Sequence, residues 1–371
     1  MTEPVLQHLV VVPEGTAGGP RRMAWWDWPC TGSDASRVVV CVHGLSRQGR
    51  DFDVLARALQ PHARVVSVDV AGRGHSDWLA DPSGYQVPTY ATDIAQLLMQ
   101  LRQQHPHGLI DWVGTSMGGL IGMALAAQPG LGIHRLVLND VGPVIQWEAL
   151  QRIGSYVGTN PSFDTEQQAI DYLATISTGF GPHTPEQWAS LSRPMLRQRE
   201  GRWWLHYDPA IAVPFRQMAT DDQAARQSAQ AGEAMLWALF DAITCPTLLL
   251  RGADSDLLSA ATAEAMSRRG PRPSVVTWPG GHRPAIDRLG VYPRPEQDRL
   301  PIGPVSILSH DGRILGPQDL WLTRRENVGI RADGTREEAG PKVARGVGRD
   351  LHADLLELRI ERHREPGLGC R

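Results

Sequence analysis

The segment spanning residues 112–119 constrains the possible folds of this chain more than any other. It reads Trp-Val-Gly-Thr-Ser-Met-Gly-Gly and contains a Gly-x-Ser-x-Gly pattern centred on Ser116. An apolar run over residues 109–113 leads into the pattern, and an Ala-, Leu- and Met-rich run over 120–128 follows it. This order predicts a strand, a sharp turn and a helix, because the two glycines let the strand and the helix close on a strained serine. We therefore expect the hydroxyl of Ser116 to stand clear of the sheet edge at a helix N-terminus, where an oxyanion can be stabilised.

Strand-like and helix-like segments alternate on both sides of this turn. Continuous apolar runs such as residues 38–42 are typical of strands that are buried on both faces of a parallel sheet. Further strands are predicted at 64–69, 109–113, 136–140, 246–252 and 274–278, with helices at 51–60, 90–104, 120–128 and 259–268, and with an opening antiparallel pair at 5–12 and 22–28. The alternation predicts an α/β fold with a mostly parallel central sheet flanked by helices.

The strand pattern stops between residues 143 and 242. Helix-like segments replace it at 146–157, 165–178, 185–198 and 232–241, and aromatic residues are dense there. We expect residues 1–142 and 243–289 to form the core and residues 143–242 to form a helical cap above the carboxyl ends of the strands, where α/β sheets bind ligands. Residues 290–371 are rich in Arg, Pro and Gly, and we expect a poorly ordered tail there.

Composition excludes several partners. The net charge of −3, with a pI of about 6.5, does not favour binding to nucleic acid. No apolar run approaches the roughly 18 residues of a membrane span, so no membrane insertion is expected. Four scattered cysteines (Cys30, Cys41, Cys245 and Cys370) suggest neither a disulfide framework nor a metal site, and they favour a reducing cytoplasm. The composition does not decide whether the chain forms a homo-oligomer.

Nucleophilic catalysis by a serine needs a histidine base and a carboxylate that orients the base. Ser116 is followed along the chain by Asp254 and Asp256, after the strand that ends at residue 252, and then by His282 in a Gly-Gly-His turn. We favour Asp256 as the acid, because the apolar residues directly after it can anchor the loop. Asp254 is the alternative, and Asp140, at the end of an earlier strand, is a weaker third candidate.

A tetrahedral intermediate needs preorganised hydrogen-bond donors. The N–H of Met117 is predicted as one donor and the N–H of Leu45, in the loop after the strand at residues 38–42, as the other. Arg47, Arg50 and Asp51 follow in that loop. Holding the loop and contacting substrate are alternative roles for them, and we favour an interpretation as solvated loop charges.

The sequence predicts neither a metal nor a cofactor. The histidines show no H-x-x-H or H-E-x-x-H spacing, and we assign His75 a structural role or a place at the rim of the site. A phosphate-binding GK[ST] loop is absent from the sequence, and Gly72-x-Gly74 lacks the third glycine of a dinucleotide fingerprint.

Together, these motifs resemble those of cap-bearing α/β-hydrolases of the esterase and meta-cleavage-product-hydrolase type. The resemblance covers roughly residues 20–285 and rests on five motifs in order: His43-Gly44-Leu45, the 69–76 segment with its two glycines and Ser76, the 114–119 turn, the 252–256 segment, and Gly281-His282. It implies Ser116 as nucleophile, His282 as base, Asp256 or Asp254 as acid, oxyanion donors at Leu45 and Met117, and a helical cap. A serine at the turn argues against the aspartate-based dehalogenases and epoxide hydrolases of the same fold.

The predicted function is therefore hydrolysis of a small-molecule carboxylic ester or thioester with a modest apolar group, through an acyl-enzyme. A carbon–carbon hydrolase of ring-cleavage dienoates is the alternative enzyme, although Arg283 stands where such relatives commonly carry tryptophan. A catalytically impaired, ligand-binding homologue is the third hypothesis.

Overall fold

The computed structural model describes residues 2–12, 19–32, 36–181, 183–218 and 222–278, together with the two dipeptides 307–308 and 314–315. Contacts divide the chain into two units, residues 1–324 and residues 325–371. All described residues belong to the first unit, and the structure below is that of this unit.

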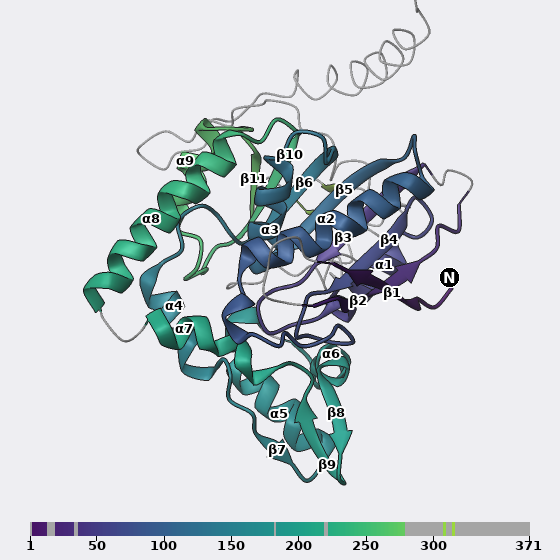
Figure 1. The fold of residues 1–371 in the computed structure, drawn as a ribbon, viewed down its shortest axis with the longest axis vertical. Coiled ribbons are helices and arrows are strands. Elements are labelled where there is room, and N and C mark those ends of the chain that lie inside the picture. The colour runs from purple at the N-terminus through teal and green to yellow at the C-terminus, as the bar shows by residue number, and fades with distance from the viewer. Residues whose placement is uncertain are drawn as a thin grey trace, which may run out of the picture. The chain divides into compact units, whose positions relative to one another are not determined.

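An eight-stranded sheet forms the centre of the unit (Figure 1). Its strands lie in the order β1 (Val5–Val11), β2 (Arg21–Trp28), β4 (Arg64–Asp69), β3 (Arg37–Val42), β5 (Leu109–Thr115), β6 (Ile133–Asn139), β10 (Thr247–Gly252) and β11 (Ser274–Trp278). The β1–β2 and β2–β4 pairs are antiparallel, and the pairs from β4 to β11 are parallel. The predicted fold class and the opening antiparallel pair are confirmed.

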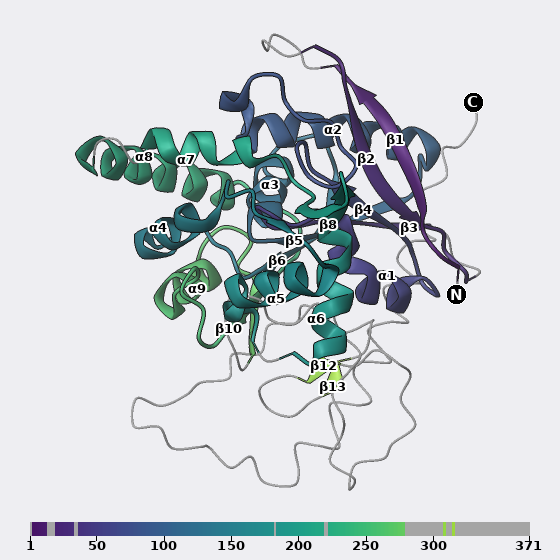
Figure 2. The ribbon, with the colours of Figure 1, turned by 90° about the horizontal axis from the view of Figure 1, so that it is seen from below.

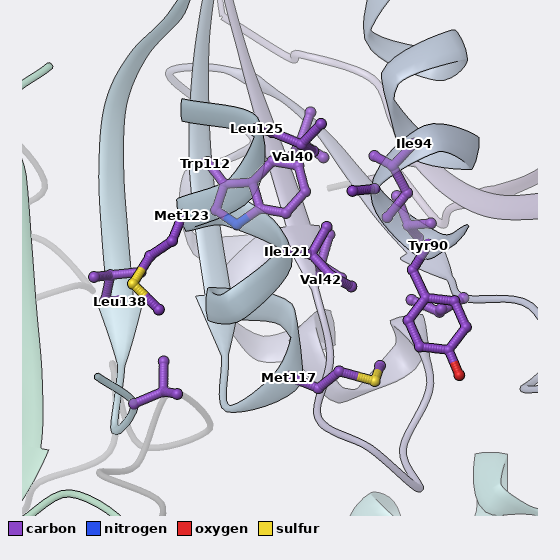
Figure 3. Packing of buried hydrophobic residues seen from close by; sticks show 14 of the residues in the cluster. Val40, Val42, Tyr90, Ile94, Trp112, Met117, Ile121, Met123, Leu125 and Leu138 are labelled. Atoms are coloured by element: carbon purple, nitrogen blue, oxygen red, sulfur yellow. The ribbon is translucent and has the colours of Figure 1, made fainter. Parts of the chain in front are cut away.

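Helices cover both faces of the sheet (Figures 1 and 2). The core helices are α1 (Asp53–Leu59), α2 (Val87–Gln104), α3 (Met117–Ala126) and α9 (Ala260–Arg268), with 3₁₀ turns at Gly49–Phe52 and Pro82–Gly84. One hydrophobic core joins α2 and α3 to the sheet through Ile94, Trp112 and Ile121, and a second core joins α1 to the opposite face through Phe52 and Leu55. Figure 3 shows the first core, with the side chain of Met117 extending from α3 toward Tyr90 on α2. The sheet is thus fixed from both sides.

The segment between β6 and β10 includes all of residues 143–242, where a cap is predicted. It contains α4 (Trp147–Tyr156), α5 (Glu166–Ile176), α6 (Pro185–Ser192), α7 (Val213–Met218) and α8 (Asp222–Asp241), with 3₁₀ turns at Thr178–Phe180, Arg193–Met195 and Pro209–Ala212. It also contains a three-stranded antiparallel sheet of β7 (Ser162–Phe163), β9 (Arg202–Leu205) and β8 (Leu196–Arg199), where the sequence predicted only helices. Helix α8 packs on α3 of the core.

The predicted helix over residues 185–198 is wrong in its second half. Helix α6 ends at Ser192, and Pro194 stands in the 3₁₀ turn that follows, since a proline does not continue a regular helix. Residues 196–199 instead pair with β9.

The predicted tail, residues 290–371, lies outside the described residues except for β12 (Ile307–Leu308) and β13 (Ile314–Leu315), which pair antiparallel. Of the helices in the described part of the chain, none has the length and apolar character that a bilayer span requires.

Candidate active site

Ser116 lies on the turn between β5 and α3 with φ of 51° and ψ of −118°, a backbone conformation that residues other than glycine rarely adopt. The flanking glycines explain how this turn closes. A Cβ built on Gly118 would lie 2.0 Å from the carbonyl oxygen of Val42, and one built on Gly114 would lie 2.3 Å from the carbonyl oxygen of Gly118. The N–H of Ser116 donates to the carbonyl of Asn139 on β6 at 3.0 Å. The predicted strand, sharp turn and helix are therefore present, and the serine is held in a strained geometry.

The two predicted oxyanion donors belong to segments that contact this turn. Met117 is the first residue of α3, so its N–H points out of the helix N-terminus. Leu45 follows Gly44, and a Cβ built on Gly44 would lie 3.6 Å from the Cβ of Ser116. The loop after β3 thus passes directly beside the serine.

Arg73 connects these two segments, a role that sequence analysis did not predict. Its side chain is fully buried. Nε donates to the carbonyl of Leu45 at 2.8 Å, Nη1 donates to the carbonyl of Ala71 at 2.7 Å and to the hydroxyl of Tyr90 at 2.9 Å, and Nη2 lies 3.8 Å from the sulfur of Met117. Within the described residues no carboxylate pairs with this guanidinium. Arg73 therefore stabilises the loop of Leu45 through carbonyl and hydroxyl acceptors.

His43 fixes the start of the same loop. Its Nδ1 lies 2.6 Å from the carbonyl of Gly44, and its Nε2 accepts the N–H of Val70 at 3.0 Å. This pairing requires a proton on Nδ1 and none on Nε2. Burial, the main cause, lowers the pKa of His43 to about 3, so the neutral ring is the stable form.

Asp69 joins the end of this loop to the turn that carries His75. Its carboxylate accepts the N–H of Gly49 at 2.7 Å and the N–H of His75 at 2.9 Å. Burial raises the pKa of Asp69 to about 7 in spite of these two hydrogen bonds. The ring of His75 packs edge-on against the rings of Trp26 and His206, in line with the structural role expected for it.

Two of the loop charges are not solvated, contrary to the sequence interpretation. Arg47 and Asp51 are both buried and form a two-pronged ion pair, with Nε–Oδ2 at 2.8 Å and Nη2–Oδ1 at 2.6 Å. Arg47 also donates to the carbonyl of Leu191 in the cap at 2.8 Å. Arg50 is half-buried, where it pairs with Asp53 and lies 4.6 Å from the ring centroid of Trp26. The Arg47–Asp51 pair, four residues apart in the sequence, satisfies both charges, and this makes the burial of Arg47 and Asp51 possible.

The three candidate acids lie in different surroundings. Asp256 is exposed and forms a bidentate ion pair with Arg152 of α4, with Nε–Oδ2 at 2.8 Å and Nη2–Oδ1 at 3.1 Å. Asp254 is also exposed. Asp140 is fully buried and adopts a positive φ of 52° directly after β6.

The buried carboxylate of Asp140 is held by the loop that carries the other two. Oδ1 accepts the N–H of Gly252 at 3.1 Å, and Oδ2 accepts the hydroxyl of Ser255 at 2.7 Å. Since the preceding residue, Asn139, accepts the N–H of Ser116, Asp140 and the serine turn occupy the same edge of the sheet. His282, the predicted base, lies outside the described residues.

A pocket opens beside the loop of Leu45. Ser46 and Arg47 line it from the core, and Arg152, Tyr156, Leu173, Ile176, Ser177, Gly179, Phe180, Met195, Leu205 and Tyr207 line it from the cap segment. Most of its wall is apolar, and two arginines provide its charge. In the part of the chain that the structure describes, no group of three His, Cys, Asp or Glu side chains could hold a metal ion.

The fold and the serine turn together define the class of this protein. Residues 37–288 match the family model of the α/β hydrolase fold. The chain belongs to the α/β-hydrolase fold family, and it is a hydrolase.

Three relatives show where the chain stands within the family. It is 48% identical to a 3-hydroxybutyrate-oligomer hydrolase of Cupriavidus necator, over 72% of this chain and 89% of that protein. It is 30% identical to a 2-(acetamidomethylene)succinate hydrolase of Mesorhizobium japonicum, over 66% of this chain and 80% of that protein. A crystal structure of an α/β hydrolase from Novosphingobium aromaticivorans superposes with a TM-score of 0.63 at 34% identity, covering 77% of this chain and 94% of that one.

Proposed function

We propose that this chain hydrolyses carboxylic esters through an acyl-enzyme on Ser116, and that its substrates are short linear oligomers of 3-hydroxybutyrate or a closely related hydroxy acid. The strained conformation of Ser116 at the N-terminus of α3 is the observation that carries the chemistry. The substrate class is supported by the 48% identity to the Cupriavidus necator hydrolase over most of both chains. Such oligomers are esters whose small methyl-bearing units agree with the modest apolar group expected from the sequence.

The proposed reaction has two halves. The hydroxyl of Ser116 attacks the ester carbonyl while His282 accepts the hydroxyl proton, and the N–H groups of Leu45 and Met117 stabilise the oxyanion. His282 then gives the proton to the departing alcohol oxygen. In the second half, water attacks the acyl-enzyme with His282 as base and releases the carboxylic acid. One water is consumed for each ester bond, and the serine is regenerated.

We assign the orienting carboxylate to Asp140 and keep Asp256 as the alternative. Burial favours Asp140, because an acid that fixes a histidine tautomer works from a desolvated, hydrogen-bonded position. The strained backbone of Asp140 also fits a functional position, since residues at positive φ cluster at active sites. Both carboxylates accept two hydrogen bonds, Asp140 from Gly252 and Ser255 and Asp256 from Arg152, so the difference between them is that Asp256 is exposed.

Labelling with a fluorophosphonate tests the nucleophile. The wild-type protein should be labelled covalently and should hydrolyse a 3-hydroxybutyrate dimer, whereas Ser116→Ala should do neither while keeping the wild-type melting temperature. Labelling that persists in Ser116→Ala would refute the assignment of the nucleophile.

A pair of asparagine substitutions tests the acid. Asp140→Asn should lower kcat by about 1,000-fold or more, because asparagine cannot hold the histidine in the required tautomer. Asp256→Asn should lower kcat by less than about 10-fold, since asparagine keeps the size of the side chain and removes only its charge. The reverse order, with both variants folded by circular dichroism, would identify Asp256 as the acid.

A further inference from the structure

The pocket beside Leu45 is lined by two arginines and a tyrosine. Arg47 is two residues beyond Leu45, whose N–H is the proposed oxyanion donor, and it faces the pocket from the core. Arg152 and Tyr156 face the pocket from α4, four residues apart and therefore on one side of the helix. These three groups therefore face one pocket beside the loop that carries the proposed oxyanion donor.

Arg152 already binds a carboxylate. Its Nε and Nη2 engage the two oxygens of Asp256 in the planar, two-bond arrangement that arginine prefers with carboxylates. The pair is open to solvent, with 43% of the Arg152 side chain and 49% of the Asp256 side chain exposed. An exposed pair of this kind contributes little to stability, and a second carboxylate can displace Asp256 at low cost.

Tyr156, Arg47 and Arg152 together form what we call the polar corner of a mostly apolar pocket. Burial raises the pKa of the Tyr156 hydroxyl, and the charges of Arg152, Asp256 and Arg47 all act on it. The hydroxyl of Tyr156 therefore stays protonated at neutral pH and is a donor. Arg47 keeps its Nε and Nη2 on Asp51 and Leu191, and its Nη1 makes no hydrogen bond among the residues described.

We propose that this corner binds the terminal carboxylate of the substrate, with Arg152 as the specificity-determining residue and Tyr156 and Arg47 as supporting donors. The inference rests on the proposed function. In an oligomer of a 3-hydroxy acid, two carbons separate the alcohol oxygen of the last ester from the free carboxylate. A carboxylate held in this corner, close to the oxyanion loop, places that last ester at Ser116. The enzyme then removes one hydroxy acid at a time from the carboxyl end.

Capping the carboxylate provides the test. The full-length protein is assayed with a 3-hydroxybutyrate dimer, with the methyl ester of the same dimer, and with p-nitrophenyl butyrate, which carries no carboxylate. Arg152→Gln should raise KM for the free-acid dimer by about 10- to 100-fold, the range of a lost charge-assisted contact. The same variant should change KM for the other two substrates by less than about 3-fold, with kcat nearly unchanged.

Arg202→Gln serves as the matched control, because Arg202 is another cap arginine that pairs with an exposed aspartate, Asp164, and it does not line the pocket. It should leave every KM unchanged. Equal losses for capped and free dimers in Arg152→Gln would overturn the proposal, and so would a wild-type enzyme that cleaves both dimers equally well. Wild-type cleavage of p-nitrophenyl butyrate without cleavage of either dimer would overturn the carboxylate site and the substrate class but keep the esterase chemistry. No cleavage of any ester would instead refute the proposed function itself.

Discussion

Replacement of Arg73 by methionine should separate catalysis from stability. The side chain is fully buried and donates to the carbonyls of Leu45 and Ala71 and to the hydroxyl of Tyr90. Methionine fills much of the same volume and donates nothing, so these acceptors lose their partner. Each unsatisfied buried acceptor costs about 1–3 kcal/mol. Removing a buried charge that has no carboxylate partner among the described residues offsets part of the loss. We expect a net decrease of about 2–4 kcal/mol in the free energy of unfolding.

The effect on rate follows from the position of Leu45. Without its carbonyl anchor the loop shifts, and the proposed oxyanion donor at Leu45 moves with it. Loss of one such donor costs about 100- to 1,000-fold in kcat. A displaced donor should cost less, so Arg73→Met should lower kcat on p-nitrophenyl butyrate by about 10- to 100-fold, with KM nearly constant.

Arg102→Met is the matched control, since Arg102 also donates to two backbone carbonyls, those of Leu131 and Gly132. These carbonyls directly precede β6 and therefore lie at the amino ends of the parallel strands, whereas the serine turn lies at their carboxyl ends. Urea unfolding gives the stability of both variants, and kcat is measured where each is fully folded. A wild-type kcat in folded Arg73→Met would refute the idea that Arg73 positions the oxyanion loop.

Other predictions concern backbone contact, hydrogen bonding and pH. Gly118→Ala should lower activity at least about 100-fold and lower the melting temperature, because the added Cβ would lie 2.0 Å from the carbonyl oxygen of Val42. Gly154→Ala is the control, because Gly154 lies in helix α4 and its added Cβ would meet nothing within 4 Å. This variant should stabilise the protein by up to about 1 kcal/mol in urea unfolding. Trp112→Phe should cost about 1–3 kcal/mol in the same assay, because the carbonyl of Gly118 loses its indole donor at 3.1 Å. Burial is the main cause that lowers the pKa of His206 to about 4 from its ordinary value of 6.5, so the unfolded chain takes up this proton first as the pH falls. The stability of the wild type relative to His206→Gln should therefore drop by about 3 kcal/mol between pH 7 and pH 4, and a difference that stays constant with pH would contradict this.

The core of the fold was predictable because its signals are local. Continuous apolar runs such as residues 38–42 place strands that are buried on both faces, and the periodic helices between them complete the parallel topology. The turn at Ser116 was predictable for the same reason, since the two glycines that close it stand two residues away on either side. Both features depend on residues that lie within a few positions of one another along the chain.

The cap was harder to predict because its sheet is short and its signals are ambiguous. Strands β8 and β9 are joined by Glu200 and Gly201, which have φ values of 51° and 75° and form a tight hairpin turn. The Glu-Gly pair was the available signal, and the helix-like spacing of residues 185–198 obscured it. Contacts that join distant segments carry no local signal at all. Arg152 and Asp256 are 104 positions apart, and only the folded chain brings them together.

The two candidate acids, Asp140 and Asp256, illustrate why chain order alone does not decide a catalytic site. Strands β6 and β10 are parallel neighbours, and the N–H of Asp140 donates to the carbonyl of Leu250 at 2.8 Å. The loops that follow both strands therefore open at the same end of the sheet, and either loop can carry the proposed acid. Sequence order favours the later strand, whereas burial and backbone strain favour Asp140 on the earlier one. If Asp140 orients the base, Asp256 is left to pair with Arg152, and the charge at the pocket is then set by a residue that substrate can displace.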